Sequence, residues 1–88
     1  MDMNKLNDLR KQVVKLAIDS KISDNIIMKY DGEVIGTYEC WAMGEPDSKS
    51  PLEWLNGNIT FCINLKGRDI NKVTLEMTHD NKRPWPFG

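Results

Sequence analysis

The sequence contains few of the residues on which cross-linked and metal-binding sites depend. Among its 88 residues there are two cysteines and one histidine. Two cysteines cannot supply the disulfide framework of a small secreted domain, and with one histidine they do not make a structural zinc site. We therefore expect no metal site and no cofactor. We expect Cys40 and Cys62 to be buried free thiols, with a cross-strand disulfide as the alternative.

A large excess of charge of either sign is also missing. The chain has 12 basic and 13 acidic residues, which gives a net charge of −1. Dedicated nucleic-acid-binding domains usually have a strong basic excess, so this balance argues against a nucleic-acid partner. Any phosphate contact would depend on local groups of cations. There are two such groups. The first consists of Lys66, Arg68 and Lys72, and the second of Lys82 and Arg83.

Long apolar segments are absent as well. No segment of the chain approaches the ~18 consecutive apolar residues that a membrane span requires. The N-terminal residues carry regularly spaced charges and are not typical of a signal peptide. We therefore expect a cytoplasmic protein with no membrane association. Eighty-eight residues, 40% of them apolar, suffice for one domain with one core.

Helical spacing of apolar residues predicts an amphipathic helix over residues 4–20. The main apolar stripe of this helix consists of Leu6, Leu9, Val13, Leu16, Ala17 and Ser20. Val14 and Ile18 lie outside the stripe. They either widen the side that faces the core or form a second side that contacts a partner.

Alternation of apolar and polar residues predicts two strands after the helix, over residues 26–30 and 33–43. Asp31 and Gly32 between them predict a hairpin, because both positions of a type I′ turn need positive φ. The second strand carries bulky apolar residues on both faces, so we expect either that it is central in the sheet or that the sheet is covered on both sides at this end. Gly36 within it is a candidate site for a β-bulge.

A capping box marks the start of a short helical turn in the middle of the chain. Ser50 and Glu53 have the required spacing, and Pro51 occupies the first helical position. Gly57 stands where a helix C-terminus favours positive φ. The pattern predicts a single turn over residues 50–57 that covers part of the sheet.

Two further strands are predicted over residues 58–66 and 72–80. The side chains expected to face the first helix are Ile59, Phe61, Ile63, Val73, Leu75 and Met77. The predicted fold is α+β: an N-terminal amphipathic helix packed on a four-stranded, mainly antiparallel meander, in the order α-β-β-(short α)-β-β. Residues 1–88 form one domain, with 81–88 as an extended tail rich in proline and aromatic residues.

The tail provides the clearest sign of a binding surface. Trp85 lies between two prolines and next to Phe87, so its backbone is stiff and loses little entropy when it becomes ordered. Tryptophan is also enriched at binding hot spots. We predict that the tail binds a partner; sealing its own sheet is the alternative. The predicted binding residues are Arg83, Trp85, Phe87, Trp54, Tyr38 and His79.

No catalytic residue is predicted, because no nucleophile or second base stands beside the single histidine in the sequence. We expect a small non-enzymatic interaction protein: an inhibitor, immunity protein, antitoxin or phage-type anti-defence factor. It would bind a protein partner, or sequester a small ligand as an oligomer. A homodimer is favoured, since one helix covers only one face of the sheet. The alternative is a small RNA-binding or RNA-cleaving protein that uses His79 with Lys82 and Arg83.

Overall fold

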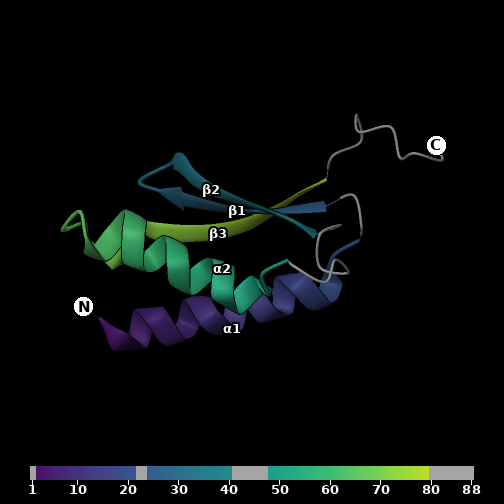
Figure 1. Ribbon diagram of the computed structural model, residues 1–88, viewed down its shortest axis with the longest axis horizontal. Helices are drawn as coiled ribbons and strands as arrows, with labels where there is room; N and C mark the ends of the chain where they lie inside the picture. Colours follow the sequence, from purple (N-terminus) through teal and green to yellow (C-terminus); the bar gives the residue numbers. More distant parts are fainter. Residues whose placement is uncertain (1, 22–23, 41–47, 80–88) are drawn as a thin grey trace.

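Two layers make up the fold in the computed structural model, which describes residues 2–21, 24–40 and 48–79. The elements are α1 (Met3–Asp19), β1 (Asp24–Tyr30), β2 (Glu33–Glu39), α2 (Pro51–Asn58), the π-helical η2 (Ile59–Asn64), the 3-10 turn η3 (Ile70–Lys72) and β3 (Val73–His79). Helices α1 and α2 lie on the same side of the sheet (Figure 1). The α+β class and the N-terminal helix are thus confirmed.

Helix α1 has nearly the bounds that its sequence predicts. The Asp2 side chain caps its N-terminus by accepting hydrogen bonds from the backbone N–H groups of Asn4 and Lys5. The fully buried residues of the helix are Leu6, Leu9 and Val13. Val14 and Ile18 are 38% and 77% exposed, so they form a second side instead of widening the buried one.

The sheet has three described strands in the order β2-β1-β3, with both neighbours antiparallel to β1. The prediction of four strands in a meander was therefore wrong. The expectation that the second strand is central was also wrong, because β3 returns to pair with β1 and leaves β2 at an edge. Residues 41–43, predicted to extend that strand, lie outside the described part of the chain.

The hairpin between β1 and β2 forms as predicted. Asp31 and Gly32 both have positive φ, 51° and 87°. The pairing register then shifts: Met28 is opposite Gly36, but the next residue, Lys29, is opposite Val34. The extra residue makes a bulge directly beside Gly36.

The two faces of the sheet differ in character. The face toward the helices buries Ile26, Met28, Tyr38 and Val73. The outer face is mixed: Ile27 lies between Thr37 and Glu76, and Val34 lies opposite Lys29, which forms an ion pair with Glu76 at 2.8 Å. The predicted inward side of the last strand is confirmed, since Val73 is buried and Leu75 packs against the core.

The helix that follows residue 50 is longer than predicted. Ser50 caps it by accepting a hydrogen bond from the backbone N–H of Glu53 at 3.2 Å, and Pro51 occupies the first turn, as expected. Gly57 does not end the helix, which continues as η2 to Asn64. The strand predicted over residues 58–66 is therefore absent.

Packing explains why this segment is helical. Leu55, Ile59 and Ile63 are four residues apart, and all three are buried. The spacing of Ile59 and Ile63 fits one side of a helix and also one face of a strand, so alternation alone was ambiguous. Phe61, halfway between them, distinguishes the two structures, because a strand would bury it beside Ile59 and Ile63 and a helix would turn it away from them. It is 66% exposed, so its predicted place in the core was wrong.

Helix α2 approaches β2 closely at one point. A Cβ atom on Gly36 would lie 2.9 Å from the Asn58 Oδ1 atom, so a larger residue there would force the Asn58 side chain to shift. The Asn58 side chain is held by a 3.0 Å hydrogen bond that its amide donates to the Trp54 carbonyl.

Candidate interaction surface

Two of the predicted binding residues, Tyr38 and Trp54, meet inside the fold. Their ring centroids are 5.6 Å apart, and the side chains are only 5% and 9% exposed. The Tyr38 hydroxyl donates a 2.7 Å hydrogen bond to the Lys49 carbonyl. The pair therefore joins β2 to the start of α2, and a direct contact of either ring with a partner stays a prediction.

Of the other four predicted binding residues, the structure describes only the backbone of His79. Arg83, Trp85 and Phe87 lie outside the described residues, as does the rest of the tail. His79 ends β3, where its backbone pairs with Asp24. Its side chain is not among those described.

Burial changes the chemistry of two groups near the end of β2. It raises the pKa of the Tyr38 hydroxyl, and the charge of Cys40 in its thiolate form, which exists only at alkaline pH, and the charge of Glu53 act in the same direction. Burial likewise raises the pKa of the Cys40 thiol; Asp24 adds to the increase, and a hydrogen bond with Ser20 opposes it. At neutral pH both groups are therefore protonated and unreactive.

The two cysteines are free thiols, as predicted, but they differ in exposure. Cys40 is 3% exposed. Cys62 is partly exposed on η2, where its Sγ donates a hydrogen bond to Asn58 Oδ1 at 3.7 Å. Because Cys62 belongs to a helix, the alternative of a cross-strand disulfide does not apply.

Alkylation by iodoacetamide should separate these two thiols. At pH 8 we expect Cys40 in the folded protein to react at least about tenfold more slowly than Cys62, because burial blocks access and raises its pKa. Peptide mass spectrometry at successive times measures both rates, and in urea the rates should become similar. Equal rates in the folded protein would show that Cys40 is accessible.

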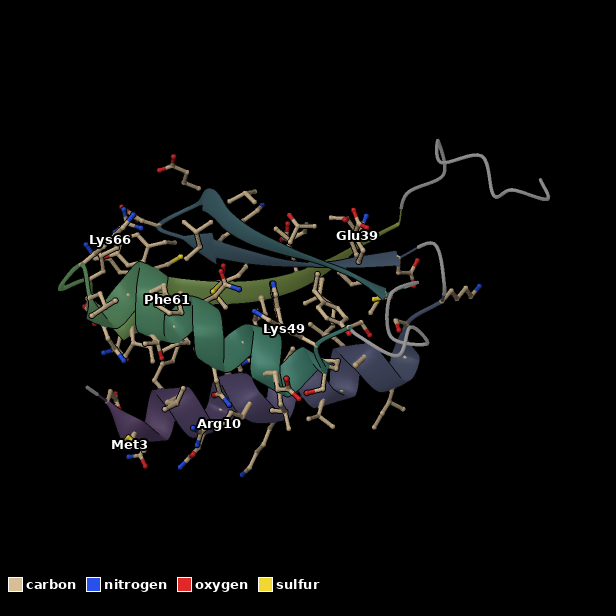
Figure 2. All side chains as sticks on the ribbon, viewed as in Figure 1. Met3, Arg10, Glu39, Lys49, Phe61 and Lys66 are labelled. Atoms are coloured by element: carbon tan, nitrogen blue, oxygen red, sulfur yellow. The ribbon has the colours of Figure 1, made fainter. Side chains whose placement is uncertain are left out.

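Large exposed apolar side chains gather on the helices. We define the helical face as Met3, Val14, Ile18, Leu52, Phe61 and Leu65. All six are on α1, α2, η2 or the turn that follows, and in the described ranges only Val34 is comparably exposed elsewhere. Figure 2 shows Met3 on α1 and Phe61 on the helix formed by α2 and η2. The apolar surface is therefore on the helical layer.

The helices run in opposite directions along the sheet (Figure 1). Arg10 on α1 links them through a 3.3 Å hydrogen bond from its Nε atom to Asn56 Oδ1 on α2. Val14 lies one turn after Arg10 and Leu52 one turn before Asn56. These two apolar residues therefore lie toward the same end of the helical layer, as does Ile18.

A second apolar group lies along the helix formed by α2 and η2. Phe61 and Leu65 are four residues apart and 66% and 71% exposed. Gly57 precedes Phe61 by the same interval, and a Cβ built on Gly57 would meet nothing within 4 Å. We call Gly57, Phe61 and Leu65 the ridge. The ridge is not evident from the sequence because residues 58–66 alternate like a strand; the four-residue spacing that follows the capping box is the signal that indicates it.

A polar depression of about 580 Å³ lies beside the end of η2. Its lining consists of Asp2, Asn64, Gly67, Arg68, Asp69 and Ile70. The guanidinium carbon of Arg68 stands 5.2 Å from the Tyr30 ring centroid, and hydrogen bonds from Asn71 lower the pKa of Asp69. These contacts stabilise the loop before β3. Within the described residues, no three His, Cys, Asp or Glu side chains are grouped to hold a metal ion.

None of the described helices combines the length and the apolar character needed to cross a membrane. Comparison of the chain with known protein families, with curated proteins and with solved structures finds no match.

Proposed function

We propose that the protein is a small interaction protein that acts by binding another protein through its helical face. The observation that carries this proposal is the exposure of Ile18, Phe61 and Leu65, at 77%, 66% and 71%. Single exposed apolar residues are ordinary on proteins, whereas several on one layer are typical of a binding surface. Inhibitors, immunity proteins, antitoxins and anti-defence factors act in this way.

The spacing of these residues supports helix-mediated recognition. Helices that dock in grooves use anchors three or four residues apart, as are Val14 and Ile18 on α1, and Phe61 and Leu65 on the second helix. The outer face of the sheet has a different composition. Thr37, Thr74 and Glu76 are exposed there and remain stably hydrated without a partner, and Val34 is the one large apolar side chain of the described strands that is strongly exposed.

The tail is proposed to add to the same binding surface. β3 ends at His79 opposite Asp24, and Asp24 begins the strand that follows α1. Residue 79 therefore lies toward the end of the molecule where Ile18 is exposed. Arg83, Trp85 and Phe87 follow within eight positions of His79, and their composition is that of a binding hot spot.

Capture from cell lysate tests the proposal. We expect the tagged protein to retain a defined protein partner, and the double variant Ile18→Lys/Phe61→Lys to lose at least about 90% of it, since charges in an apolar contact are costly to desolvate. The matched control is Thr37→Lys/Thr74→Lys, which adds the same charges to the outer face of the sheet. Both variants are first checked by circular dichroism melting.

Two results would contradict the proposal. One is equal retention of the partner by the helical-face variant and by the control. The other is capture of RNA in place of protein, measured by nuclease-sensitive absorbance of the eluate, which would favour the RNA-binding alternative.

A further inference from the structure

We infer that the ridge of Gly57, Phe61 and Leu65 binds a second copy of this chain. The helix formed by α2 and η2 in one chain packs antiparallel to the same helix of the other chain, about a twofold axis. The inference rests on the proposed function, because it names the partner for one part of the helical face. Val14 and Ile18 on α1 are left free for a different protein.

Gly57 is the first observation that points to a second chain. It lies in the interior of the helix formed by α2 and η2, where glycine is a poorer helix former than alanine. Its φ is not positive, and a Cβ there would meet nothing within 4 Å. The fold of one chain therefore does not require glycine here. Close packing of another chain against the helix backbone does require it, because any side chain at this position would hold that chain away.

The ridge is complementary to a copy of itself. Phe61 projects one turn beyond Gly57 on the same side of the helix, so a large exposed ring and an uncovered backbone lie next to each other. When two such helices meet antiparallel, Phe61 of each chain lies opposite Gly57 of the other. An interface about a twofold axis requires this reciprocal arrangement.

Charges at the two ends of the helix also match in this arrangement. Glu53 is exposed one turn before Gly57, and Lys66 is exposed directly after Leu65. Figure 2 shows Lys66 toward the same end of the molecule as Phe61. Antiparallel packing therefore brings Glu53 of each chain toward Lys66 of the other, so both ends of the interface pair opposite charges. Parallel packing would instead oppose like charges at each end.

The contact is modest in size, since it is made mainly by one helix of each chain. Stable interfaces bury about 1,200–2,000 Å² in total. We therefore expect a dimer with a dissociation constant of roughly 1–100 µM instead of an obligate dimer. Association should be visible in purified protein without any other component.

Sedimentation equilibrium of the purified full chain tests the inference. The wild-type protein should show a monomer–dimer equilibrium, and Phe61→Lys should raise the dissociation constant at least about tenfold. Gly57→Leu should do the same while melting at or above the wild-type temperature, because its side chain enters open space in the monomer. Val34→Lys, which replaces an exposed apolar residue of β2, is the matched control and should dimerise like the wild type.

Charge reversal tests the antiparallel arrangement. Glu53→Lys and Lys66→Glu should each weaken self-association severalfold, because like charges then meet at both ends of the interface. An equal mixture of the two variants should recover association, since opposite charges meet at both ends of the mixed dimer. Raising the salt concentration should reduce these differences.

A wild-type protein that stays monomeric at several hundred micromolar would overturn the inference. So would a dimer that Phe61→Lys and Gly57→Leu leave unchanged. Neither result affects the proposed function if lysate capture still depends on the helical face. The opposite combination of results is also informative. If the dimer depends on the ridge, but capture of another protein depends on neither the ridge nor Ile18, the inference is supported and the proposed function is contradicted.

Discussion

Replacing Ile63 by alanine is expected to lower the free energy of unfolding by about 2–5 kcal/mol, whereas Phe61→Ala should change it by less than about 0.5 kcal/mol. Ile63 is fully buried on η2 and belongs to the core that the helices and the sheet share. Phe61, two residues earlier, projects into solvent. A cavity forms in the first variant, and no buried contact is lost in the second.

Urea denaturation measures both changes. A low micromolar protein concentration keeps the chain monomeric, so that self-association does not contribute to the measured stability. Ile59→Ala serves as a positive control, because that side chain is also buried on the same helix. A strand over residues 58–66 would instead place Ile59, Phe61 and Ile63 on one face. Losses of similar size in all three variants would therefore contradict the helix.

Replacing Trp54 by alanine is expected to cost about 3–5 kcal/mol, the usual range for a core tryptophan. Trp54 packs against Tyr38 with a 5.6 Å centroid separation and an interplanar angle of 54°. Truncation would remove this ring contact and the burial of the indole at the start of α2. The chain would then have little stability left, since small domains have only about 5–15 kcal/mol in total.

Tyr38→Phe is the matched variant for this site. It keeps the ring and removes only the hydrogen bond to the Lys49 carbonyl, so we expect a loss of about 0.5–1.5 kcal/mol. Chemical denaturation followed by far-ultraviolet circular dichroism compares the two variants without relying on tryptophan fluorescence. A Trp54→Ala protein with wild-type stability and impaired partner binding would show that the indole acts at a surface.

The sequence predicted the first helix, the hairpin turn and the start of α2, because each of these depends on residues that are close together in the chain. The apolar stripe through Leu9 and Val13, the Asp31-Gly32 turn and the Ser50 cap each depend on residues within a few positions of one another. The segment after Gly57 was different. Its alternation fits a strand and its four-residue spacing fits a helix, and only the burial of Ile59 and Ile63 in the shared core selects the helix.

The candidate surface was predicted less well than the fold, for the same reason. Assigning residues 58–66 to a strand put Phe61 inside and left Leu65 unnoticed as an exposed side chain. Tyr38 and Trp54 were singled out because aromatic residues are common at interfaces, but that frequency does not show whether a ring faces solvent. The sequence placed Ile18 outside the main stripe of α1 but left open whether it widens the buried side or forms a second one, and its 77% exposure decides for the second side.

The strand order has a consequence for how the chain reaches this structure. β1 pairs with β2 across a two-residue turn, but Tyr30 of β1 pairs with Val73 of β3, 43 positions away. Hairpins close within about 1–10 µs, whereas closing a longer loop costs more chain entropy. Arrival of β3 at the free edge of β1 should thus limit the folding rate. Until then, that edge of the hairpin is open to pairing with strands of other molecules.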